Sequence, residues 1–69
     1  MKIVLFGYGK MGKEVEKIAL ERGHKVILKI EEDEEYDISE ADVAIDFSVP
    51  KAAFNNITSC FKKNIPVIS

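Results

Sequence analysis

The glycine-rich segment at residues 7–12, Gly-Tyr-Gly-Lys-Met-Gly, constrains the fold of this chain more than any other stretch. It follows an apolar run at residues 3–6 and opens a segment with helical periodicity. The order strand, glycine turn, helix directs backbone N–H groups and the positive end of a helix toward a phosphate. We predict that Gly7 permits the tight turn, Gly9 leaves the main chain open to a pyrophosphate, and Gly12 allows close helix–strand packing.

Short apolar runs alternate with helical patterns along the rest of the chain. Gly23 and Asn64 are expected to end the two helices in a left-handed conformation, and Ser48 with Pro50 is expected to start the second one. The patterns predict strands at residues 2–6, 26–30, 43–47 and 66–68, and helices at residues 10–22 and from about 50 to 63.

Each predicted helix carries an apolar stripe that we expect to face the sheet. The stripe residues are Met11, Val15, Ile18 and Ala19 in the first helix, and Ala53, Phe54, Ile57, Cys60 and Phe61 in the second.

The link between the second and third strands has no segment of helix length. It begins with five consecutive carboxylates at residues 31–35, which we expect to form a solvated, mobile loop because like charges repel. Residues 38–41 could form one turn.

Strand–helix–strand units are right-handed, so these elements predict an open parallel sheet of about four strands in the order 2-1-3-4, with one helix on each face. This is a Rossmann-like α/β fold in truncated form, one partial dinucleotide-binding domain over residues 1–69. Ligands of such sheets bind at the carboxyl ends of the strands, where the strand order reverses. The glycine turn, Phe47 and Ser48 are expected to meet there.

Glu31 ends the second strand about 20 residues beyond the glycine turn, where an acidic side chain accepts hydrogen bonds from the adenosine ribose. Because it would repel a 2′-phosphate, NADH is preferred over NADPH, although Lys29 could weaken that preference. Glu31 could also be only the first member of the acidic run. Lys10 has two open interpretations, a phosphate contact and a solvated lysine at a helix start. Asp46 is favoured as a structural residue that accepts backbone donors.

Composition excludes several classes of function. The net charge is −2 and the sequence shows no basic patch, which argues against nucleic-acid binding. No apolar run is long enough for a membrane span. Cys60 is the only cysteine, so we expect a buried thiol, no internal disulfide, and a cytoplasmic protein without a signal peptide. No catalytic constellation and no metal-ligand cluster stands out.

Three segments together resemble the amino-terminal part of dihydrodipicolinate reductase, also named 4-hydroxy-tetrahydrodipicolinate reductase. They are residues 1–12, the Ala-Ile-Asp-Phe-Ser-Val-Pro run at residues 44–50, and residues 65–68. The resemblance covers the whole chain and implies an NAD(P)H-dependent oxidoreductase of lysine and diaminopimelate biosynthesis. The cofactor-binding residues that it implies are Gly7, Tyr8, Gly9, Lys10, Met11, Gly12, Glu31, Phe47 and Ser48.

The family pattern continues beyond residue 69 with a Gly-Thr-Thr-Gly segment, a catalytic His-His region with a Lys, and a domain for substrate binding and tetramer formation. None of these is in the chain, so the resemblance implies a fragment that binds NAD(P)H and is not catalytic alone. A second hypothesis is a shortened or reconstructed α/β scaffold without ligand function. Its open sheet edge at residues 67–68 could pair with a second copy to form a homodimer, or the two copies could exchange the second helix and last strand. A third is a regulatory nucleotide-sensing domain of a transport protein. The sequence alone does not say whether such a truncation is natural or engineered.

Overall fold

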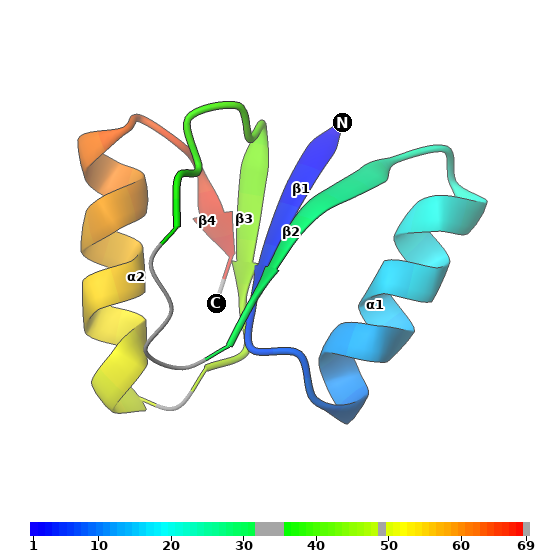
Figure 1. Ribbon diagram of the computed structural model, residues 1–69, viewed down its shortest axis with the longest axis horizontal. Helices are drawn as coiled ribbons and strands as arrows, with labels where there is room; N and C mark the ends of the chain where they lie inside the picture. Colours follow the sequence, from blue (N-terminus) through cyan, green and yellow to red (C-terminus); the bar gives the residue numbers. More distant parts are fainter. Residues whose placement is uncertain (32–35, 49, 69) are drawn as a thin grey trace.

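The computed structural model describes residues 1–31, 36–48 and 50–68. Within these ranges, two helices and four strands follow one another in the predicted alternation (Figure 1). They are β1 (Lys2–Phe6), α1 (Lys10–Glu21), β2 (Lys25–Ile30), β3 (Val43–Asp46), α2 (Pro50–Lys62) and β4 (Val67–Ile68). The predicted third strand extends one residue too far, because Phe47 already lies outside β3.

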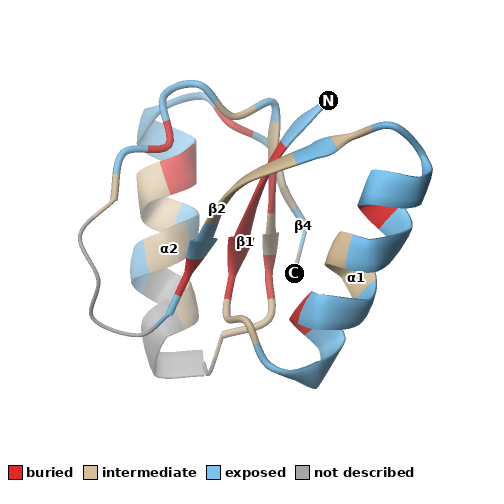
Figure 2. Cartoon of the chain, turned by 45° about the vertical axis from the view of Figure 1, so that its right-hand side comes forward, coloured by how far each residue is buried: buried red, intermediate tan, exposed pale blue. Residues whose placement is uncertain are grey.

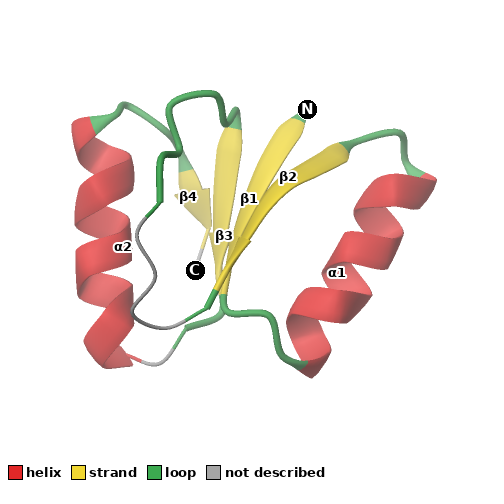
Figure 3. Ribbon diagram, in the orientation of Figure 1, coloured by secondary structure: helices red, strands yellow, loops and turns green. Residues whose placement is uncertain are grey.

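The four strands form one sheet in the order β2-β1-β3-β4, and every neighbouring pair is parallel. The two helices lie on opposite sides of this sheet, and both start from the end where the strands terminate (Figure 3). The predicted Rossmann-like α/β fold and its strand order are therefore confirmed.

The core consists of two layers, one on each face of the sheet, with β1 at the centre (Figure 2). Alternate residues of β1 serve the two layers, as the two-residue period of a strand requires. Val4 and Phe6 pack with Cys60 and Ile65 on the α2 side, and Ile3 and Leu5 pack with Ala19 on the α1 side. Cys60 is fully buried, as expected of a small apolar residue.

The pairing of β2 with β1 contains one irregularity. Ile3 pairs with Val26 but Val4 pairs with Leu28, so Ile27 is an extra residue in β2. An extra residue reverses the alternation of side chains beyond it. As a result Lys29 lies on the α1 side of the sheet, while Ile27 and Leu28 both contact the α2-side core.

The described residues between β2 and β3, 31 and 36–42, form a loop and no crossover helix. Ile38 in this loop is 2% exposed and belongs to the α2-side core. Asp42 fixes the end of the loop, since its amide donates to the carbonyl of Lys2 at 2.8 Å and its carboxylate accepts from the amide of Lys2 at 2.7 Å. The predicted turn at residues 38–41 is present, with a hydrogen bond from Ala41 N to Ile38 O. The acidic residues 32–35 lie outside the described part of the chain.

The predicted helix ends are confirmed, but the predicted apolar stripes are partly wrong. Gly23 and Asn64 have φ values of 82° and 58°, and α1 and α2 stop just before them. Met11 is 63% exposed and Phe61 is 82% exposed, so neither packs on the sheet. Ile18 is 49% exposed and Ile57 is 37% exposed, so both are only partly covered. The Phe54 side chain lies outside the described part.

Each sheet face covers only one side of its helix. A residue at the margin of the apolar stripe therefore packs only if a further element lies beside the helix, which the periodicity of the helix alone does not reveal. Within the described residues, neither helix is long and apolar enough to cross a membrane.

Candidate functional site

Backbone hydrogen bonds join the ends of three neighbouring strands at one edge of the sheet. The Gly7 amide donates to the carbonyl of Ile30 at 2.7 Å, and the Phe47 amide donates to the carbonyl of Phe6 at 2.7 Å. The turn after β1, the residue after β2 and the loop after β3 are thereby adjacent. The structure thus brings together Glu31, the glycine turn and residues 47–48, as the strand order predicts.

Gly7 and Gly12 fill two close-packed positions in the turn. Gly7 has a φ of 86°, and a Cβ atom there would lie 3.0 Å from the Phe47 carbonyl carbon and 3.1 Å from the Ser48 nitrogen. A Cβ atom on Gly12 would lie 2.8 Å from the Gly7 carbonyl oxygen. Only glycine fits at either position without movement of the backbone.

Gly9 differs, because a Cβ atom built on it would meet no atom of the described residues within 4 Å. Its φ of −88° and ψ of −154° are open to other residues, so folding alone does not require glycine here. Among the described residues, the space that a Cβ atom would occupy at this N-cap position of α1 is therefore open. This open approach to the main chain is the observation expected for a position that faces a diphosphate.

The start of α1 offers its amides without competition from side chains. Gly9 is the N-cap and provides no side-chain hydrogen bond, and the first turn has no acidic residue. The first intrahelical bond runs from Lys13 N to Gly9 O at 3.0 Å, which leaves the amides of residues 10–12 ahead of it. Uncapped amides at the positive end of a helix suit an anion, so these residues fit a dinucleotide diphosphate.

The charged residues around this helix start are solvent-accessible. Lys10 and Glu31 are exposed, and Met11 is exposed beside Lys10. Glu31 directly follows Ile30, whose carbonyl holds Gly7. Both Lys10 and Glu31 are therefore accessible to a ligand that lies across the turn.

Tyr8, inside the glycine turn, belongs to a polar cluster that the sequence did not reveal. Its hydroxyl donates to the Glu16 carboxylate, and the Lys29 ammonium lies 3.2 Å from Glu16 and 4.9 Å from the centre of the Tyr8 ring. Lys13 approaches the same ring at 5.9 Å. Lys29 reaches Glu16 only because the extra residue in β2 turns it to the α1 side. The Glu16 carboxylate thereby holds Lys29 on α1 rather than at Glu31.

The pKa values within this cluster shift in the directions expected of mutual stabilisation. The hydrogen bond from Tyr8, followed by Lys29, lowers the pKa of Glu16, and the Glu16 carboxylate raises the pKa of both Lys29 and Tyr8. All three groups are solvent-accessible, which weakens their interaction through screening.

Replacing Glu16 with glutamine should therefore lower the melting temperature slightly at neutral pH. The pKa of Glu16 falls below its ordinary value of 4.5 on folding, so the ionised Glu16 side chain contributes fully to the stability of the fold above that pH. The contribution disappears as the pH drops through the lower folded-state pKa, so wild type and variant should converge in acid. Thermal melts by circular dichroism between about pH 7 and pH 3 test this. Glu14→Gln removes the same charge from an exposed position of α1 and should have a smaller effect.

The loop after β3 is held by Asp46, which is 5% exposed on the α2 side of the sheet. Its Oδ1 atom accepts hydrogen bonds from the Ser48 amide at 2.7 Å and from the Ser48 hydroxyl. Asp46 thus accepts donors from the backbone, as predicted. Ser48 uses its hydroxyl for Asp46 and for Asn56 of α2, whose Nδ2 donates to it at 3.1 Å.

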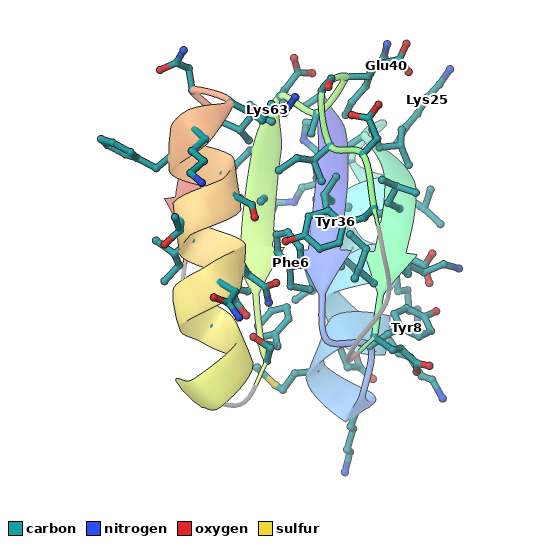
Figure 4. All side chains as sticks on the ribbon, turned by 60° about the vertical axis from the view of Figure 1, so that its left-hand side comes forward. Phe6, Tyr8, Lys25, Tyr36, Glu40 and Lys63 are labelled. Atoms are coloured by element: carbon teal, nitrogen blue, oxygen red, sulfur yellow. The ribbon has the colours of Figure 1, made fainter. Side chains whose placement is uncertain are left out.

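A separate depression of about 390 Å³ lies on the other part of the α2 face, lined by Ile27, Leu28, Asp37, Ser39 and Glu40. Glu40 lies at the end of the molecule opposite Tyr8 (Figure 4). The carboxylates of Asp37 and Glu40 in this depression would repel a diphosphate. The depression therefore suits the predicted ligand less than the start of α1 does. Among the described residues no group of three or more His, Cys, Asp or Glu side chains is placed to hold a metal ion.

The parallel sheet, its strand order and the glycine turn at the start of α1 define the class of protein, a Rossmann-like α/β domain. Residues 23–69 match the family model described as dihydrodipicolinate reductase, N-terminus, and the chain belongs to this family. The family match begins after the glycine turn.

Curated relatives named 4-hydroxy-tetrahydrodipicolinate reductase extend the similarity to the whole chain. A Christiangramia forsetii relative is 57% identical and covers 100% of this chain, and a Staphylococcus aureus relative is 37% identical and covers 99%. A relative from another Staphylococcus aureus strain is 42% identical over 78% of the chain. The chain spans about 30% of the length of these relatives.

Proposed function

We propose that this chain binds NAD(P)H as the cofactor-binding part of a dihydrodipicolinate reductase of lysine and diaminopimelate biosynthesis. Its residues would hold the cofactor and supply no catalytic group, so the chain alone binds without turnover. The open main chain at Gly9, in front of the uncapped start of α1, is the observation that carries this proposal. The name of the relatives supports a reductase, and the cytoplasm is where we expect it to act.

In this proposal the amides of residues 10–12 bind the diphosphate, and Lys10 adds a positive charge. Tyr8 shapes the turn through Glu16, and the exposed Met11 lies at the rim of the site. Phe47 and Ser48 line the site beyond Gly7, because their backbone atoms lie 3.0–3.2 Å from the position that a Cβ atom on that glycine would take. Glu31 accepts hydrogen bonds from the adenosine ribose.

NADH is the preferred cofactor in this proposal because of the charges near Glu31. The Lys29 ammonium, which could otherwise receive a 2′-phosphate, is 3.2 Å from Glu16. A bound 2′-phosphate would therefore face the Glu31 carboxylate, and Lys29 would have to leave its ion pair to offset the repulsion.

Calorimetric titration with NADH, NADPH and ADP-ribose tests both parts of the proposal. We expect NADH to bind with a dissociation constant below about 1 mM and more tightly than NADPH. Glu31→Gln should lower the affinity for NADH by about 10-fold, which corresponds to the loss of one charge-assisted hydrogen bond. It should also reduce the difference in affinity between NADH and NADPH. Glu21→Gln, the same change at the far end of α1, is the control. No binding of any of the three ligands at millimolar concentration would contradict the proposal.

The second candidate function is self-assembly through the β4 edge, without a ligand. Ile68 is 60% exposed on this two-residue edge strand, and Phe61 is 82% exposed. An edge strand presents unpaired backbone groups with which a second copy can pair. Sedimentation of the titration samples distinguishes the candidates, because a concentration-independent monomer that binds NADH leaves only the first.

A further inference from the structure

We infer that a chain of hydrogen bonds, from Tyr36 through Asn56 and Ser48 to Asp46, positions one wall of the cofactor site. This wall consists of Phe47 and Ser48 and receives the nicotinamide half of the cofactor. The inference rests on the proposed function. It adds Asn56 and Tyr36 as positioning residues, neither of which touches the ligand.

The donors in this chain all point one way, toward a buried carboxylate. The Tyr36 hydroxyl donates to Asn56 Oδ1 at 3.3 Å, Asn56 Nδ2 donates to Ser48 Oγ at 3.1 Å, and the Ser48 hydroxyl donates to Asp46 Oδ1. Such aligned bonds polarise one another, and each strengthens the next. The chain connects three segments that are distant in sequence, namely the loop before β3, the middle of α2 and the end of β3.

Asp46 lies at a buried position, where a carboxylate lowers the stability of the fold. It is 5% exposed, and within the described part of the molecule its Oδ2 atom has no hydrogen-bond partner. A buried carboxylate with one unpaired oxygen destabilises the fold. What it achieves locally is the fixed geometry of the residues after β3, because its other oxygen holds both the amide and the hydroxyl of Ser48.

Tyr36 anchors the far end of the chain by packing. Its ring meets the ring of Phe6 edge to face, with centroids 5.2 Å apart and planes at 68° (Figure 4). Phe6 is the last residue of β1 and directly precedes Gly7. Asp46 pairs with the same Phe6 in the sheet, so both ends of this series of hydrogen bonds adjoin the residue that precedes the glycine turn.

The strand order decides which half of the cofactor this wall serves. Glu31 follows β2, and residues 47–48 follow β3, so they lie on opposite sides of the turn after β1. A dinucleotide with its adenosine ribose at Glu31 and its diphosphate in front of Gly9 then extends its second half toward Phe47 and Ser48. Disturbing these hydrogen bonds should therefore weaken the binding of the nicotinamide half and leave the affinity for ADP unchanged.

The test compares Asn56→Ala with Asn55→Ala, the same change at the neighbouring exposed position of α2. Asn56→Ala should weaken NADH by about 5- to 10-fold and change the affinity for ADP by less than about 2-fold. Asn55→Ala should leave both affinities unchanged. Tyr36→Phe, which keeps the ring on Phe6, should weaken NADH by about 2- to 3-fold and decides the matter if Asn56→Ala does not fold.

Amide hydrogen exchange without ligand gives a second readout, independent of the proposed function. Asn56→Ala, or Tyr36→Phe in its place, should speed exchange at Ser48 by about 5-fold or more, while the centre of β1 stays protected. Equal losses for NADH and ADP, or unchanged exchange at Ser48, would overturn the inference. A wild-type chain that binds neither ligand would refute the proposed function, and the exchange at Ser48 would still test the chain of hydrogen bonds.

Discussion

Replacing Gly9 with valine is expected to reduce the affinity for NADH by about 100-fold or more while the chain remains folded. The valine side chain would occupy open space at the N-cap of α1, where a Cβ atom meets no atom of the described part of the chain within 4 Å. A diphosphate held there by amides loses charge-assisted hydrogen bonds worth about 1.5–3 kcal/mol each when it is displaced. Two such bonds correspond to at least about two orders of magnitude in affinity.

The fold should tolerate this change, because the backbone of Gly9 is extended, with a φ of −88°. The expected cost is a weaker N-cap, because valine caps a helix less well than glycine does. This should lower the free energy of unfolding by about 1 kcal/mol or less. Isothermal titration with NADH, together with a urea melt of the same protein, measures both effects. Unchanged affinity in a folded Gly9→Val chain would remove the start of α1 from the binding mechanism.

Replacing Gly7 with alanine is expected to lower the free energy of unfolding by about 2–5 kcal/mol, enough to unfold much of a small domain. A left-handed backbone, with its φ of 86°, costs an alanine about 1–2 kcal/mol. Contact of the new methyl group with Phe47 and Ser48 at 3.0–3.1 Å adds about 1–3 kcal/mol of overpacking.

Gly23→Ala is the matched control for the first of these effects. Gly23 has nearly the same φ, 82°, but a Cβ atom there would meet none of the residues that the structure describes within 4 Å. It should therefore cost only about 1–2 kcal/mol. Urea denaturation of Gly7→Ala, Gly23→Ala and Gly9→Ala should rank them in that order of decreasing loss. Equal losses at positions 7 and 23 would show that the contact with residues 47–48 does not matter.

Local signals in the sequence predict most of this fold. Gly23 and Asn64 end their helices because a left-handed residue stops a helix whatever surrounds it. The strand order follows from the handedness of the crossovers, and it brings Glu31, the glycine turn and residues 47–48 to one edge. These predictions depend only on neighbouring residues and on rules of connection.

Features that depend on register or on distant partners could not be predicted in the same way. Lys29 pairs with Glu16 because Ile27 is an extra residue in β2, and nothing in the composition of that strand marks the irregularity. The partners of Asn56 lie at positions 36 and 48, which no periodicity connects to it. Phe61 is exposed although it continues an apolar stripe, because whether a stripe packs depends on the surface beside it.

The central claim is that the amides at the start of α1 bind the diphosphate of the cofactor. A ¹H–¹⁵N NMR titration of the wild-type chain with NADH tests it most directly, because it reports on each amide separately. We expect the largest shift changes at residues 9–12, with smaller changes at Glu31 and Ser48. Binding that leaves the amides of residues 9–12 unperturbed while those of another segment move would contradict the claim.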